Sequence, residues 1–118
     1  MREELVEAVL RVVEEIPEGR VATYGMIARA VGTGPRVVGR IMHDWGGGVP
    51  WWCVVNVHGT FPTTIRSEGI SEWEREGIPH DSTRGKVLVA ACVVEQDWLD
   101  AVARSVLENL CDHAEMSD

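Results

Sequence analysis

The 118-residue sequence lacks any long hydrophobic run. No stretch approaches the roughly 18 consecutive apolar residues that a membrane-spanning helix needs. The N-terminus, Met1-Arg2-Glu3-Glu4, also lacks the charged start and apolar middle of a secretory signal. We therefore expect a cytoplasmic protein that does not contact a membrane. Its length, with 45% hydrophobic and 25% charged residues, predicts one globular domain over residues 1–118.

Cysteine is scarce as well. Cys53, Cys92 and Cys111 are odd in number, widely spaced and set among apolar residues. This pattern is typical of reduced, buried thiols rather than of a disulfide framework. No cysteine has the close neighbour that zinc-ligand spacing requires, and the four histidines are scattered along the chain. We expect neither a metal nor another cofactor.

Basic residues are outnumbered, with 11 lysines and arginines against 19 aspartates and glutamates and a net charge of -8. This balance argues against a nucleic-acid partner, because phosphates attract lysine and arginine. The distribution along the chain argues otherwise. Residues 20–66 carry five arginines and one aspartate, and all the excess acid lies before or after them. One face of the fold can therefore still be basic.

Helical periodicity governs the start of the chain. Apolar side chains recur at helical spacing from Leu5 to Ile16, with glutamates on the other faces. Pro17 and Gly19 follow directly, and both residue types end helices. We predict an amphipathic helix that ends at Pro17.

Two shorter helices follow, joined by a glycine-containing turn. Thr23 is a favourable N-cap for the first helix. Pro35 suits the first position of the second, which we expect to run to about Asp44. Such a pair forms a helix-turn-helix pattern. Arg36 and Arg40 lie one turn apart on its outer edge, where they are either simply solvated or bind phosphates.

A glycine-rich stretch then leads into a predicted strand. Gly46-Gly47-Gly48 frees the backbone, and Pro50 stiffens its exit. Trp51 and Trp52 open a β-branched run that indicates a buried strand, roughly Trp52–Val57. The two tryptophans either pack in the core or line a site where a flexible loop meets a rigid element.

The C-terminal half predicts one more strand between two helices. Ser67–Glu76 reads as a helix stopped by Gly77. Lys86–Val94 is a continuous apolar run, which we interpret as a strand although a short buried helix looks alike. Asp97 to about Cys111 has its apolar residues in helical register. The remaining tryptophans are expected to be packing residues rather than a stacking platform, with contact to the pocket loop as an alternative for the first of them: Trp45, Trp73 and Trp98.

The order of these motifs resembles the DNA-binding domain of O6-alkylguanine-DNA alkyltransferases. It is still more similar to their non-enzymatic relatives, the alkyltransferase-like proteins. The resemblance covers roughly residues 4–78, and residues 86–118 form a C-terminal strand and helix beyond it. It implies an α+β fold of the winged helix-turn-helix type, mostly helical with short strands. The motifs that carry it are Ile16–Gly25 (IPEGRVATYG), Arg36–Met42 (RVVGRIM) and Val49–Asn56 (VPWWCVVN), with Gly59 after them. The helix end Arg75–Ile78 (REGI) also fits the alkyltransferase-like proteins.

The resemblance also implies that the transfer chemistry is absent. In the transferases the strand opens with Pro-Cys-His-Arg, and the histidine activates the cysteine as a nucleophile. Here Pro50 is followed by Trp51 at the cysteine position and Trp52 at the histidine position. An indole N–H is only a donor, so neither residue can accept an alkyl group or act as a base. We expect no alkyltransferase activity.

The binding half of the family pattern is retained. By resemblance, Arg36 fills the space that a flipped nucleotide leaves in the base stack, and Tyr24 presses against the neighbouring phosphate. Trp51 lines the lesion pocket, and Arg40 contacts a phosphate. Pro50 and Trp52, on either side of Trp51, are also predicted to bind the DNA or the lesion. The loop that shapes the pocket contains Asn56 and Gly59.

Two features depart from the family. Cys53 replaces an arginine that usually follows Trp-His or Trp-Trp in the alkyltransferase-like proteins, so a polar partner of the loop is lost. Cys53 as a displaced nucleophile is disfavoured, because no base stands beside it. The segment from Lys86 onward is longer and more apolar than the resemblance implies, and it either covers the domain or forms a surface for a partner.

These observations favour a monomeric, non-catalytic protein that binds double-stranded DNA containing O6-alkylguanine by flipping the nucleotide. The family implies that it then directs the lesion to nucleotide excision repair proteins. One alternative is a helix-turn-helix transcription factor or nucleoid protein without lesion specificity. Another is a protein interaction module that has lost DNA binding, which the acidic net charge would suit.

Overall fold

Helices make up most of the fold, and the strands are short. The structure, a computed structural model, describes residues 3–60 and 65–116, and for Arg66 and residues 111–116 it describes the backbone only. The elements are α1 (Glu3–Glu14), β1 (Ala22–Thr23), α2 (Tyr24–Val31), α3 (Pro35–Trp45), η1 (Gly46–Gly48), η2 (Trp51–Cys53), β2 (Val54–Val55), α4 (Arg66–Glu76), β3 (His80–Asp81), β4 (Lys86–Val87), α5 (Val89–Cys92) and α6 (Gln96–Met116). This mostly helical fold with short strands confirms the predicted fold class.

The predicted helix-turn-helix is present as α2 and α3. The Thr23 hydroxyl accepts a hydrogen bond from the Met26 N–H at 3.1 Å, which caps the first turn of α2. Gly32 ends the helix in the left-handed conformation, with φ +82°. Pro35 occupies the first turn of α3, where its missing N–H leaves no bond unmade. Local cap chemistry therefore fixes both ends of the turn.

A short parallel pairing joins the helix-turn-helix to the tryptophan stretch. β1 pairs with β2 in the register Ala22 to Val54 and Thr23 to Val55, and all four residues are buried. The predicted strand Trp52–Val57 is therefore wrong in its extent. Residues Trp51–Cys53 form a 3-10 turn instead, because the Cys53 N–H donates to the Pro50 carbonyl.

The predicted strand over Lys86–Val94 is also wrong beyond its first two residues. β4 is only Lys86–Val87, paired with β3 as an antiparallel hairpin. Val89–Cys92 is the short helix α5, and the chain becomes extended again where Val93 pairs with Val21. An apolar run this short has no period that separates a strand from a buried helical turn. The helix predicted to end at Gly77 is confirmed as α4.

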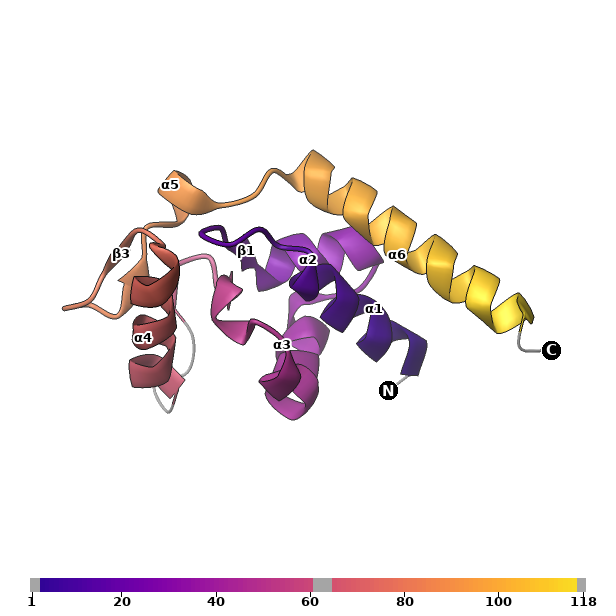
Figure 1. The fold of residues 1–118 in the computed structure, drawn as a ribbon, viewed down its shortest axis with the longest axis horizontal. Coiled ribbons are helices and arrows are strands. Elements are labelled where there is room, and N and C mark those ends of the chain that lie inside the picture. The colour runs from indigo at the N-terminus through magenta and orange to yellow at the C-terminus, as the bar shows by residue number, and fades with distance from the viewer. Residues whose placement is uncertain (1–2, 61–64, 117–118) are drawn as a thin grey trace.

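The long helix α6 lies across α1 and α2 (Figure 1) and confirms the predicted C-terminal helix. It buries Leu99, Ala103 and Val106 against the core. Trp73 is fully buried, as predicted, whereas Trp45 is 60% exposed and does not pack as expected. Trp98 meets the expectation only in part, since it is 36% exposed.

The cysteine prediction holds where side chains are described. Cys53 and Cys92 are buried free thiols, and the side chain of Cys111 lies outside the described residues. Over residues 3–60 and 65–116, no helix combines the length and the hydropathy needed to cross a bilayer.

Candidate nucleic-acid interface

The two predicted arginines of α3 are exposed. Val38 and Ile41 on the same helix are fully buried, so the helix turns Arg36 and Arg40 away from the core. The Arg40 side chain is 74% exposed, and its Nε lies 3.8 Å from Asp44 Oδ2. An exposed pair of this kind contributes little to stability and is readily exchanged for a phosphate. Both arginines are therefore available to an anionic ligand.

Tyr24 opens α2 and is half-buried. Burial raises the pKa of its hydroxyl above the usual value, so the group stays protonated at physiological pH and can donate a hydrogen bond. Because Thr23 pairs with Val55, the next residues along each strand, Tyr24 and Asn56, are brought to the same end of the parallel pair.

Asn56 organises a closed turn. Its side-chain oxygen accepts hydrogen bonds from the backbone N–H groups of His58 and Thr60 at 2.9 and 3.1 Å, and its amide donates to the Thr60 hydroxyl at 2.7 Å. Gly59 completes the turn with φ +84°. A Cβ on Gly59 would stand 2.3 Å from the Val87 carbonyl oxygen, so only glycine fits there. The turn is held to β4 by the Val87 N–H, which donates to the Gly59 carbonyl at 2.8 Å.

Trp51 and Trp52 lie on η2, directly after Pro50. All three residues are half-buried, so neither indole is sealed in the core. The two rings meet edge to face, with centroids 5.7 Å apart and an interplanar angle of 78°. The 3-10 turn lets the two consecutive indole rings contact each other. In a strand, their side chains would point to opposite faces of the sheet.

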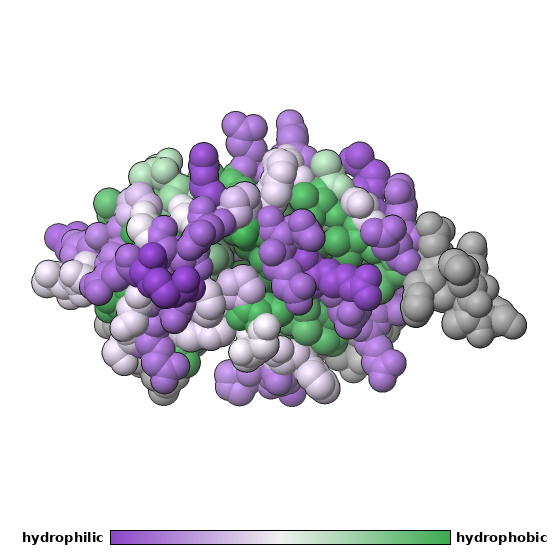
Figure 2. Space-filling model, viewed as in Figure 1, coloured by the Kyte–Doolittle hydropathy of each residue, from purple (hydrophilic) through white to green (hydrophobic). Residues whose placement is uncertain are grey.

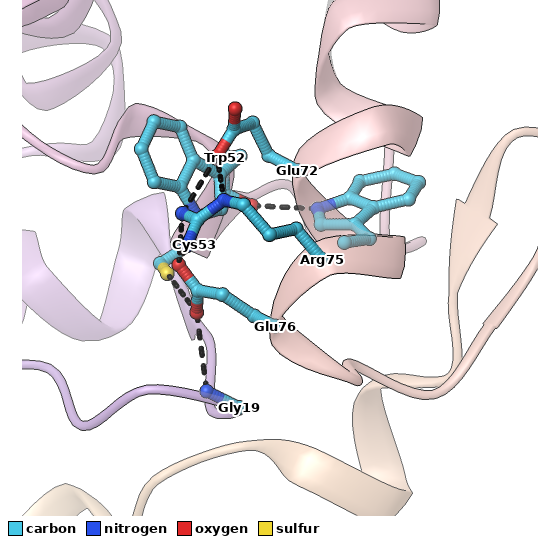
Figure 3. Close-up of polar contacts among 7 residues, drawn as sticks. Gly19, Trp52, Cys53, Glu72, Arg75 and Glu76 are labelled. Atoms are coloured by element: carbon cyan, nitrogen blue, oxygen red, sulfur yellow. Dashed lines mark hydrogen bonds and ion pairs between the residues drawn. The ribbon is translucent and has the colours of Figure 1, made fainter.

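Glu76, at the end of α4, holds Trp52 in place (Figure 3). The Trp52 indole N–H donates to Glu76 Oε2 at 2.5 Å, and the Gly19 N–H donates to Glu76 Oε1 at 3.1 Å. The Cys53 thiol lies 3.7 Å from the same Oε1. We call Gly19, Trp52, Cys53, Arg75 and Glu76 the Glu76 cluster.

In the Glu76 cluster, the buried carboxylate of Glu76 is paired with the exposed guanidinium of Arg75. The Glu76 side chain is only 6% exposed, and Arg75 lies 3.5 Å from its Oε2. Arg75 also pairs with Glu72 at 2.7 Å, and its guanidinium lies 5.7 Å from the centroid of the Trp52 ring. On the other side of Trp52, its carbonyl accepts a bond from the Trp73 indole at 2.8 Å. Trp52 is thus fixed at both its indole and its backbone.

Sequence reasoning did not single out Glu76. Its burial arises from contacts with residues 57 and 24 positions earlier in the chain, which no local pattern reveals. The available signal was the family-like run Arg75-Glu76-Gly77-Ile78 at the end of a predicted helix.

The environment of Cys53 suppresses thiol chemistry. The residue is 1% exposed. Burial raises the pKa of the Cys53 thiol far above its usual value, and the Glu76 carboxylate adds to the effect. Because the thiolate is the nucleophilic form, this cysteine is a structural residue.

The described part of the chain contains no cluster of metal-binding side chains. There, no three side chains among His, Cys, Asp and Glu gather closely enough to hold an ion.

The two arginines of α3 are not hydrogen-bonded to the Glu76 cluster. Among the described residues, the hydrogen bonds of that cluster do not include Arg36 or Arg40.

Comparisons with known proteins agree with this arrangement. The structure of S. pombe Atl1 in complex with damaged DNA containing O6-carboxymethylguanine is 32% identical in sequence, with a TM-score of 0.69. A second structure of S. pombe ATL in complex with DNA is 34% identical, with a TM-score of 0.66. Each match covers 80% of this chain and 99% of the other. Among curated proteins, no sequence matches.

The family model of the 6-O-methylguanine DNA methyltransferase, DNA binding domain, matches residues 4–77. This range contains the helix-turn-helix, the two tryptophans of η2 and Glu76. The chain belongs to the family of the 6-O-methylguanine DNA methyltransferase DNA-binding domain, within which it is an alkyltransferase-like protein.

Proposed function

We propose that this protein binds double-stranded DNA containing an O6-alkylated guanine and leaves the lesion chemically unchanged. The similar S. pombe Atl1 is seen in complex with damaged DNA containing O6-carboxymethylguanine. In this chain, α3 presents two exposed arginines to a phosphate backbone. The acidic residues that dominate the net charge lie outside residues 20–66.

The observation that carries the proposal is the fixed pair of indoles on η2. By family resemblance, Trp51 and Trp52 stand where a transferase has its cysteine and histidine. Trp52 is anchored by Glu76, and Trp51 packs edge to face on Trp52. An aromatic wall of this kind can stack on an extruded base.

Nucleotide flipping explains the role of the other residues. Extruding a base costs a few kcal/mol, which contacts to the flipped state must offset. Arg36, in the first turn of α3, fills the vacated stack, and the Tyr24 hydroxyl contacts the adjacent phosphate. Arg40 binds the backbone.

The absence of transfer chemistry follows from the same residues. Trp51 offers no thiolate to accept an alkyl group, and the Cys53 thiol is buried and kept protonated. We propose that the bound protein marks the lesion for nucleotide excision repair instead.

Equilibrium binding tests the proposal. Fluorescence anisotropy is measured with a duplex that contains one O6-methylguanine and with the same duplex unmodified. Arg36→Ala and Trp51→Ala should each reduce the preference for the lesion, whereas Arg104→Ala, which removes an exposed arginine of α6, should not. Equal affinity of the wild type for both duplexes would instead support a helix-turn-helix protein without lesion specificity. No binding at low salt would support an interaction module.

Mass spectrometry tests the non-catalytic half of the proposal. After incubation with the methylated duplex, the intact protein mass and the O6-methylguanine content of the DNA should both be unchanged. A stoichiometric gain of one methyl group by the protein would refute it.

A further inference from the structure

A hollow outside the candidate nucleic-acid interface lies where the α1–β1 connection meets the start of α6. Its volume is about 320 Å³, and its lining residues are Pro17, Arg20, Val94, Glu95 and Trp98. We propose that this hollow is a docking site for a segment of a partner protein in which an apolar side chain is flanked by lysines or arginines. The proposal goes beyond DNA binding and does not depend on it.

The walls of the hollow are fixed by hydrogen bonds. The chain before α6 runs beside the chain after α1 (Figure 1), where the Val94 N–H donates to the Val21 carbonyl at 2.9 Å. The Arg20 N–H closes a turn on the Pro17 carbonyl at 3.1 Å. Gln96 fastens the start of α6 to the Met26 carbonyl at 3.0 Å. A preformed site of this kind spends little free energy on ordering when a ligand binds.

The apolar part of the hollow centres on Trp98. The buried face of α6 is made by Leu99, Ala103 and Val106, so Trp98 lies at the edge of that face and keeps 36% of its surface exposed. Pro17 and Val94 also line the hollow. In the same orientation, Figure 2 shows hydrophobic areas bordered by hydrophilic side chains over α1 and α6. A partly exposed tryptophan in a hollow is typical of interface hot spots.

The charges around the hollow select a basic partner. Among the described lining residues, Glu95 and Arg20 have opposite charges. The segments on either side of the hollow are acidic, since residues 1–19 carry two arginines against six glutamates and residues 67–118 carry four lysines and arginines against twelve aspartates and glutamates. A second copy of this chain has a net charge of -8, and nucleic acid is an anion, so both are disfavoured at this surface. Lysines or arginines beside an apolar anchor complement it.

The experiment uses the full-length protein without DNA, so its result is independent of lesion binding. A phage-displayed library of random linear peptides is panned against the wild type, with Trp98→Ser as the counter-selection target. Synthetic copies of enriched peptides are then titrated by calorimetry against the wild type, Trp98→Ser, Glu95→Lys and the control Trp45→Ser. Trp45 is the matched control because it is an exposed tryptophan on another element.

We expect the enriched peptides to share an apolar residue flanked by lysines or arginines. Their affinity should fall about tenfold or more in Trp98→Ser and in Glu95→Lys, and it should be unchanged in Trp45→Ser. Glu95 is exposed, so Glu95→Lys tests the site even if Trp98→Ser does not fold. The proposal is overturned if no such peptides are enriched, if Glu95→Lys binds them as the wild type does, or if Trp98→Ser abolishes a wild-type dimer that occupies this face.

Discussion

The indole N–H of Trp52 donates a hydrogen bond to the carboxylate of Glu76 at 2.5 Å. The same carboxylate accepts the Gly19 N–H, so one buried side chain joins the end of α4, the turn that carries the tryptophans and the connection after α1. Because three segments that are distant in the sequence meet on this group, it sets the position of the aromatic wall that we assign to lesion binding.

Removal of the Glu76 carboxylate should destabilise the fold and loosen Trp52. Glu76→Ala leaves the partly buried N–H groups of Trp52 and Gly19 without this acceptor, which should cost about 2 kcal/mol of unfolding free energy. Glu76→Gln keeps one acceptor and should cost less. Urea unfolding measures both, and Glu74→Gln, an exposed neighbour on α4, serves as the control. A loss for Glu76→Ala no larger than that for Glu74→Gln would contradict the role of the cluster.

Gly59 should tolerate no side chain. In Gly59→Ala, the new Cβ meets the Val87 carbonyl oxygen at 2.3 Å, and φ is +84°. Gly32→Ala is the matched control, because Gly32 has a φ of +82° but no atom within 4 Å of the added Cβ. We expect about 1 kcal/mol of destabilisation for Gly32→Ala from the backbone conformation alone and at least about 2 kcal/mol more for Gly59→Ala. Thermal unfolding of the two variants compares them, and equal shifts would contradict the clash.

The protein should lose stability in alkali through Cys53. The folded state raises the pKa of this thiol above its ordinary value of 9.0, so the folded protein keeps a proton that the unfolded chain releases. This contribution is fully present below pH 9 and should fall by up to about 1.4 kcal/mol per pH unit above it. The pH dependence of the unfolding free energy from pH 7 to 10.5 should therefore be steeper in the wild type than in Cys53→Ala. Parallel profiles would show that the thiol ionises freely.

The exposed arginines of α3 should govern the salt dependence of DNA binding. Each phosphate contact that is lost lowers the slope of log K against log salt concentration by about 1. Arg40→Ala should therefore reduce the slope by this amount for lesion and unmodified duplexes alike, because a phosphate contact carries no information about the base. Titrations between low and physiological salt measure it, with Arg104→Ala on α6 as the control. An unchanged slope would place the DNA on another face.

Much of the fold could be predicted because its boundaries are set locally. Thr23, Pro35 and Gly77 begin or end helices through caps and turns that neighbouring residues determine, and the structure confirms all three. The extents of the strands could not be predicted, because a few apolar residues over Lys86–Val94 suit a strand and a helical turn equally well.

The candidate site was accessible to sequence reasoning only in part. Trp51 and Trp52 are recognisable in the sequence because they follow Pro50 directly. Their place in the family motif predicts that they replace the reactive cysteine and histidine. The anchoring of Trp52 by Glu76 depends on tertiary contacts, and so does the exposure of Trp45. A short window of sequence does not show that Glu76 is buried or that Trp45 is exposed.

The central claim is that the wild-type protein prefers a damaged duplex. The most direct measurement is the ratio of its Kd for an unmodified duplex to its Kd for the same duplex with one O6-methylguanine, under identical salt conditions. We predict a ratio of at least about tenfold, since a modified base costs less to flip and gains a specific pocket. A ratio of one would contradict the account.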